Sequence, residues 1–241
     1  MRKSRAVGLV LLATATLAQQ QQTVEITSEP SHHRVFENEY VRVFNVRVAP
    51  KASTLVHRHN YDYLFVTLGD SDVVSVRPAE KPVALQLKDG EVRFTPGHFA
   101  HAAINNADRL FHNITIELLK PSTNVRTCTE PCPFEPPDET GPRRQQRIRA
   151  SEWTVWSFTL PPSPAPLSST PFYRSTGSSS PALFIAVSAL DLSGSVPGAP
   201  KRLTSGDTVW MPPNTGYAVR RNNGAEARYV LLEFNQEPSK P

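Results

Sequence analysis

The sequence predicts an all-β protein built from two similar units. Short runs rich in β-branched and aromatic residues alternate with turn signals along most of the 241 residues, and no segment shows a sustained helical period. The second half also repeats the first: Gly90 matches Gly206 and Glu117 matches Glu233, each 116 residues further on. Many short strands predict a sandwich or barrel, and the repeat predicts two of them.

The first 18 residues predict a secretory signal peptide. Three positive charges lie in residues 1–5, before a run of apolar and small residues from Ala6 to Leu17 that is too short to span a bilayer, and Ala18 fits a cleavage site. We therefore expect a secreted or periplasmic protein with no stable membrane anchor. A retained anchor is the alternative.

Charge and cysteine content limit the choice of partners. The formal net charge is +4, and it falls to +1 without the three charges of residues 1–18. The arginines between Arg143 and Arg149 lie in a proline-rich stretch and predict a solvated linker rather than a nucleic-acid surface. Cys128 and Cys132 would suit a short-loop disulfide in an exported protein, but the sequence does not settle whether they pair.

The domain boundaries follow the composition. We expect a flexible segment at 19–32, a first barrel at 33–120, a proline-rich linker with the cysteine pair at 121–150 and a second barrel at 151–241. In the first barrel the predicted strands are 40–48, 55–59, 63–68, 72–77, 83–87, 91–95, 101–104 and 110–119. In the second, 153–160 and 183–187 repeat the strands at 41–48 and 64–68.

All seven histidines lie within the first 112 residues, and the second copy has none. His57 and His59 are two residues apart on a predicted strand and therefore share a face, and His101 follows the turn at 95–97. Three imidazoles converging inside a barrel form a plausible His₃ metal site. The alternative is a polar cluster that binds no ion. We expect His32, His33 and His112 to have no part in the site.

The second copy has lost these ligands. Tyr217 stands at the position of His101, and Thr176 and Ser178 stand near those of His57 and His59. We expect this barrel to be filled by side chains, to bind no metal and to stabilise the first barrel. Its three tryptophans, Trp153, Trp156 and Trp210, would supply apolar area for the contact.

These spacings resemble the two motifs of the cupin superfamily. The second motif, G-x₅-P-x-G-x₂-H-x₃-N, is matched by Gly90, Pro96, His101 and Asn105, and the H-x-H of the first motif is matched by His57 and His59, with Gly69 downstream. Two positions depart from the family. Tyr63 replaces the glutamate of the first motif, and P-G-H in the second motif places His98 in the turn.

The resemblance covers 33–120 well and 151–236 as a degraded copy. It implies two jelly-roll β-barrels, a bicupin, and a divalent metal held by His57, His59 and His101; Fe, Mn, Zn, Ni and Cu are not distinguished. Without the glutamate the metal keeps more positive charge and an open position. Its affinity would be expected to fall below about pH 6, where histidine protonates.

The same resemblance implies a small-molecule ligand or substrate. The reaction class is left open among oxygenase, isomerase and decarboxylase, and Tyr63 and His98 are the candidate catalytic residues. The alternative for Tyr63 is a packing role, and for His98 an exposed turn. The alternatives for the whole protein are a non-catalytic exported binding protein and a purely structural bicupin, so whether it is an enzyme is open. A homodimer is also open.

Overall fold

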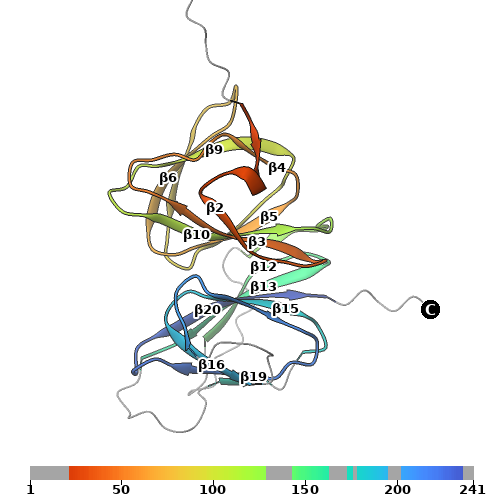
Figure 1. Cartoon of the computed structure of the whole chain (residues 1–241). Helices are drawn as coiled ribbons and strands as arrows, with labels where there is room; N and C mark the ends of the chain where they lie inside the picture. Colours follow the sequence, from red (N-terminus) through yellow and green to blue (C-terminus); the bar gives the residue numbers. More distant parts are fainter. Residues whose placement is uncertain (1–21, 129–142, 163–172, 176–177, 195–201, 236–241) are drawn as a thin grey trace, which may run out of the picture.

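The computed structural model describes residues 22–128, 143–162, 173–175, 178–194 and 202–235 (Figure 1). Within these residues the chain forms two β-barrels, and the helical structure consists of one 3₁₀ turn, η1 (Ile26–Ser28). The prediction of an all-β fold is therefore confirmed.

The first barrel consists of two five-stranded sheets. One sheet contains, in spatial order, β1 (Val24–Glu25), β4 (His57–His59), β9 (Phe99–Asn105), β6 (Ser71–Val76) and β7 (Val83–Leu87). The other contains β2 (His32–Glu37), β3 (Val41–Val48), β10 (Phe111–Leu118), β5 (Tyr63–Thr67) and β8 (Val92–Thr95). The first of these sheets carries the three candidate metal ligands.

The second barrel has the same plan. Its larger sheet contains β11 (Arg126–Thr127), β12 (Arg143–Arg149), β13 (Trp153–Leu160), β20 (Ala227–Phe234), β15 (Ala182–Ala186) and β18 (Thr208–Met211). Its smaller sheet contains β14 (Tyr173–Ser175), β19 (Tyr217–Arg221), β16 (Leu190–Gly194) and β17 (Arg202–Leu203). The order β3-β10-β5-β8 of the first barrel recurs as β13-β20-β15-β18, as the sequence repeat predicts.

The sheet of the first barrel that contains β3 and β10 packs against the larger sheet of the second barrel, and Figure 1 shows the two face to face. A single cluster of buried apolar side chains joins them: Ile114 and Ile116 of β10 contribute from the first barrel, and Val155 and Leu232 from the second. Strand alternation explains this arrangement, because the side chains between these residues face the barrel interiors. An ion pair between Asp89 and Arg228 also joins the barrels.

Two of the three tryptophans lie at this interface. The ring of Trp153 is 5.8 Å from that of Phe94, and the ring of Trp210 is 5.7 Å from that of Phe36, measured between centroids. Trp156 instead packs against the interior of the second barrel. The expectation that Trp156 contributes to the interface was wrong because, on β13, it lies one residue out of phase with the interface residues Trp153 and Val155.

The strands extend beyond the expected domain boundaries. Within the segment 19–32, β1 pairs with β4, and Ile26 is 2% exposed in the core of the first barrel. Within the expected linker 121–150, β12 pairs with β13 and buries Ile148 in the interface cluster. In each segment one apolar residue among polar ones is buried in a core and anchors the strand. The average composition of the segment therefore did not predict its structure.

The structure also bears on the cysteines and the leader. Cys128 is disulfide-bonded, and the one other cysteine of the sequence, Cys132, lies outside the described residues. The expected signal peptide at 1–18 lies outside them as well. In the described part of the chain no helix has the length and apolar character needed to cross a bilayer.

Candidate metal centre

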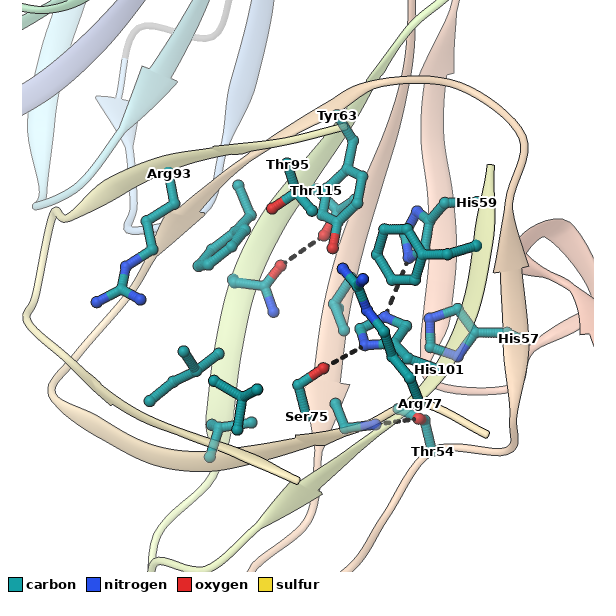
Figure 2. A pocket seen from close by; sticks show the side chains of 18 of the residues that line it. Thr54, His57, His59, Tyr63, Ser75, Arg77, Arg93, Thr95, His101 and Thr115 are labelled. Atoms are coloured by element: carbon teal, nitrogen blue, oxygen red, sulfur yellow. Dashed lines mark hydrogen bonds between the residues drawn. The ribbon is translucent and has the colours of Figure 1, made fainter. Parts of the chain in front are cut away.

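The three expected ligands lie on two neighbouring strands. β4 and β9 pair antiparallel, with His57 directly opposite His101. Because side chains alternate along a strand, His57 and His59 both point into the barrel, where each is 1% exposed, whereas Arg58 between them is exposed. His101 is partly buried beside them, and Figure 2 shows the three rings gathered on one side of the cavity.

The ring nitrogens are close enough to share an ion. One ligand nitrogen from each residue lies within 4.8 Å of the other two, and Nε2 of His59 is 3.2 Å from Nε2 of His101. Metal–nitrogen bonds of about 2.0–2.1 Å in a tetrahedral arrangement would place two ligand atoms about 3.4 Å apart. The His59–His101 pair already has this spacing.

The remaining contacts of the rings favour the same use. Nδ1 of His57 lies 2.9 Å from the carbonyl oxygen of Leu55, and Nδ1 of His101 lies 2.9 Å from Oγ of Ser75. A proton on each Nδ1 leaves Nε2 with a lone pair. Nε2 of His57 is buried without a hydrogen-bond partner among the described residues, an arrangement that costs free energy unless something binds there. The donor set therefore fits a transition-metal ion.

Burial keeps these imidazoles neutral. It lowers the pKa of His57 to about 4 and that of His101 to about 3, and it holds the pKa of His59 well below its usual value. Repulsion among the neighbouring histidines, including His32, lowers these pKa values further. At neutral pH all three rings therefore carry the lone pair that a metal requires.

Tyr63 lies inside the cavity, at the position where the family motif has its glutamate. Its ring stacks on that of His59, with centroids 4.0 Å apart and planes at 15°. Burial raises the pKa of Tyr63 to about 12, although a hydrogen bond with Thr95 opposes this shift. The hydroxyl therefore stays protonated and supplies a hydrogen-bond donor rather than a negative charge.

The structure does not bring His98 into the site. His98 is exposed in the turn between β8 and β9 at φ 64°, and it is absent from the cavity lining. Its backbone N–H donates to the carbonyl oxygen of His59 over 2.7 Å, so the residue shapes the turn. A Cβ on the preceding Gly97 would lie 2.3 Å from the backbone of Tyr61, which explains the glycine. The proposed catalytic role of His98 has no geometric support.

One buried histidine beside the site was missed. His32 lines the cavity, and its ring centroid lies 4.5 Å from that of His57. Nδ1 of His32 lies 2.6 Å from Oε2 of Glu29, a carboxylate that is 3% exposed. The other oxygen of Glu29 accepts the N–H of Leu55, the residue whose carbonyl holds His57. Glu29 thus connects the N-terminal segment to a candidate ligand.

A signal for His32 was present in the sequence. His32 and His33 are adjacent on β2, so one must face inward; His32 is buried and His33 is exposed. The expectation of a flexible segment at 19–32 did not take this strand alternation into account. The seventh histidine, His112, is absent from the cavity lining: its Nε2 bonds Oδ1 of Asn45 at 3.0 Å, near Gly206 of the second barrel. This position agrees with the expectation that His112 has no part in the site.

The cavity has a volume of about 390 Å³. Most of its wall is apolar, and the histidines, Tyr63, Ser75 and several threonines form a polar side (Figure 2). The charged residues in the lining are Arg77, Glu80, Lys81 and Arg93. This space suits one small molecule beside the histidines.

In the first barrel His57 and His101 face each other on β4 and β9. At the corresponding positions of β14 and β19 the second barrel has no histidine. Ser175 lies opposite Tyr217, as His57 lies opposite His101. Ser175 rather than Thr176 therefore has the place of His57, and Thr176 lies outside the described residues. Tyr217 is 6% exposed in the apolar interior of its barrel.

Aligned by the bond to the following turn, Ser178 has the place of His59, as expected, although two residues separate Ser175 from Ser178 and only one separates His57 from His59. The N–H of Asn214 donates to the carbonyl oxygen of Ser178, just as that of His98 donates to His59. Asn214 and His98 also share a left-handed backbone, with φ of 61° and 64°. The turn is thus preserved in the second barrel although its histidines are gone.

Solved structures with the same architecture establish the fold. AerE from Microcystis aeruginosa superposes with a TM-score of 0.56 at 10% identity, over 86% of this chain and 99% of that chain. A salicylate 1,2-dioxygenase from Pseudaminobacter salicylatoxidans gives 0.55 at 11% identity, over 81% and 71%. A cupin 2 conserved barrel domain protein from Leptotrichia buccalis gives 0.52 at 9% identity, over 85% and 88%.

No protein-family model matches the chain, and no curated protein matches it. Identities of 9–11% show the fold alone. The chain has the cupin fold in its two-barrel form, so the resemblance seen in the sequence motifs is confirmed at the level of fold.

Proposed function

We propose that the first barrel binds a divalent transition-metal ion through His57, His59 and His101 and uses it to act on a small molecule in the adjoining cavity. One observation carries this proposal: three neutral imidazoles converge on one point of a cavity, and a buried ring nitrogen there has no partner. A bound ion would supply Lewis acidity or redox chemistry.

The other residues of the cavity have separate roles in this proposal. Tyr63 donates a hydrogen bond from a hydroxyl that stays protonated. Ser75 holds the ring of His101, and Glu29 holds His32 at the cavity wall. His32 is thereby placed to exchange a proton with a bound molecule, a role that the sequence had offered to His98.

Proteins of the same fold are compatible with a catalytic role without requiring one. They include a salicylate 1,2-dioxygenase and an oxalate decarboxylase, the latter with a TM-score of 0.54 at 10% identity, and also a vicilin from Capsicum annuum with a TM-score of 0.56 at 9% identity. A non-catalytic binding protein would use the same site. Turnover by the metal-loaded chain in a screen of small organic substrates separates the two.

Metal analysis tests the site directly. The protein is purified without metal-affinity resin, its metal content is measured, and His59→Ala is compared with His98→Ala. Both variants lose one imidazole, but only His59 faces the cavity. We expect His59→Ala to lose most of the bound metal under competition with a chelator, and His98→Ala to keep it. Equal retention by the two variants would refute the assignment.

Export is part of the same proposal. The basic residues and the apolar run of 1–18 support it. Mass spectrometry of the mature protein, expressed in its own host, should find an N-terminus close to residue 19. A protein that still begins at Met1 in the cytoplasm would contradict export and would leave the metal site untouched.

A further inference from the structure

The charges that line the cavity are unbalanced. Arg77, Lys81 and Arg93 contribute positive charge, and Glu80 is the one carboxylate in the lining within the part of the chain that the structure describes. The three ligand histidines are neutral, so they would leave the charge of a bound ion uncompensated. A buried positive charge without a counter-charge is unfavourable, and an anionic ligand would supply the counter-charge.

The two arginines of the cavity differ in their availability. Nε of Arg93 bonds Oε1 of Glu91 at 2.6 Å. The guanidinium of Arg77 makes no hydrogen bond within the described residues, and its ion-pair partner Glu80 is 3.7 Å away on a side chain that is 60% exposed. A pair of that kind contributes little. Arg77 therefore keeps its donors available.

Arg77 is also held at the metal end of the cavity. Its guanidinium carbon lies 3.8 Å from the ring centroid of Phe99, a cation–π contact that stabilises this position of the group. The Phe99 centroid lies 5.3 Å from that of His101 and 5.8 Å from that of His59. Figure 2 shows the Arg77 side chain running alongside His101 toward Tyr63.

The remainder of the cavity is apolar. The rest of the wall is formed mainly by aliphatic and aromatic side chains: Val46, Phe65, Val73, Leu85, Leu87 and Phe111. Such a wall favours a hydrocarbon or aromatic body and offers few partners to a polar one. The polar and apolar parts of the lining are thus complementary to a molecule that has one charged end and an apolar body.

We propose that the substrate is a small organic acid and that Arg77 is the residue that selects it. The carboxylate lies against the guanidinium of Arg77 beside the metal position, and the apolar body lies against the wall around Phe65 and Leu87. This inference rests on the proposed function. It adds the chemical class of the ligand and the residue that recognises it.

Binding to matched acid and amide probes tests the inference. The full chain is loaded with Co²⁺ and titrated with benzoate and benzamide, and with hexanoate and hexanamide, by calorimetry and by the ligand-field spectrum. Wild-type protein should bind the acid of at least one pair about tenfold or more above its amide, since charge-assisted bidentate contacts discriminate on this scale.

Three variants locate the source of that preference. Arg77→Gln should remove most of it without loss of Co²⁺, and Arg77→Lys should keep part of it, because charge remains but the planar fork is lost. Arg58→Gln removes the same charge from an exposed side chain on the ligand strand, and should behave as wild type. Thermal unfolding of each variant confirms that it is folded.

The outcomes distinguish this inference from the proposed function. An undiminished acid preference in Arg77→Gln, or no acid preference in wild type, overturns the inference while retained Co²⁺ leaves the metal site standing. A wild-type chain that holds no Co²⁺ refutes the proposed function. In that case the same titrations on the metal-free chain still decide the role of Arg77, because the comparison of variants does not depend on the ion.

Discussion

The two barrels share a scaffold and differ in what fills it. Asn113 on β10 of the first barrel corresponds by register to Tyr229 on β20 of the second. Ser75, which holds the ring of His101, corresponds to Leu192 on β16. At these positions the cavity of the first barrel has a small polar side chain where the second has a large one.

The result in the second barrel is a packed interior. Tyr229 stacks between Phe158 and Phe184, with both centroid distances 4.6 Å and interplanar angles of 5° and 17°. Stacked aromatic rings contribute stability beyond their buried area. The first barrel lacks such a stack of rings and keeps an open cavity in its place. The comparison teaches that an open cavity is maintained at a cost in stability, which a packed second barrel can offset.

Removing the second barrel should have the largest effect. A chain of residues 19–142 lacks β12 and all later strands, so the interface cluster around Ile114 and Ile116 faces water. Exposure of a continuous apolar sheet face should cause aggregation or a large drop in melting temperature, measured by light scattering and calorimetry. A 19–142 chain that is soluble, monomeric and as heat-stable as the full chain would show that the barrels are independent.

Exchanging the corresponding residues sharpens the comparison within each barrel. Tyr229→Asn removes a ring that is 1% exposed, and should lower the free energy of unfolding by about 3–5 kcal/mol in denaturant titration. Metal binding by the folded variant should be unchanged. Asn113→Tyr places a ring in the ligand cavity, and should abolish small-molecule binding with a smaller change in stability. Equal stability losses in the two variants would mean that the interiors do not differ as described.

The sequence was sufficient for most of the strand pattern and for the three candidate metal ligands. Spacing two apart on a strand places His57 and His59 on one face wherever that strand lies, and the motif spacing fixes the turn before His101. These are local rules. They account for β7 and β13, whose observed bounds equal the predicted ones.

The sequence was insufficient where tertiary contacts decide. Glu29 looks like one polar residue among many, and only the position of β4 shows that it binds Leu55 and His32. The reach of Arg77 over Phe99 depends on the pairing of β6 with β9, which no local pattern contains. Sequence motifs therefore find the candidate metal ligands, whereas the residues around them are found only from the fold.

The pH dependence separates the two barrels again, because every histidine is in the first. The folded pKa values of about 4 for His57 and about 3 for His101 lie below the unfolded value of about 6.5. The unfolded chain therefore binds more protons as pH falls from about 6.5, and stability falls with it. At pH 5 the loss should be on the order of 2 kcal/mol for each of the two residues in metal-free protein.

The low pKa values of His57 and His101 also change the expected pH dependence of metal binding. Because the folded rings stay unprotonated to about pH 4, affinity should change little between pH 7 and 5 and fall below that range. The sequence alone had predicted a fall below about pH 6.

The pH dependence of stability is tested with His101→Gln. Denaturant titrations of metal-free protein should show a smaller loss of unfolding free energy between pH 7 and 5 for this variant than for wild type. Identical losses would mean that His101 does not titrate in this way.

The smallest expected effect concerns the contact that the second barrel lacks. Ser75→Ala removes the hydroxyl 2.9 Å from Nδ1 of His101 and leaves the ring free to rotate or change tautomer. Loss of such an outer contact typically weakens metal binding about 10- to 100-fold. We expect the lower end of that range, because His57 keeps its own contact with the Leu55 carbonyl and continues to hold the ion.

Ser71→Ala is the matched control: it removes a hydroxyl from the same strand, bonded to Gly69 at 3.1 Å and outside the cavity lining. Competition with a chelator should rank Ser75→Ala below Ser71→Ala, and Ser71→Ala level with wild type. If both variants bind metal as wild type does, the Ser75 contact does not orient the ligand, and the loss of this serine in the second barrel reflects packing alone.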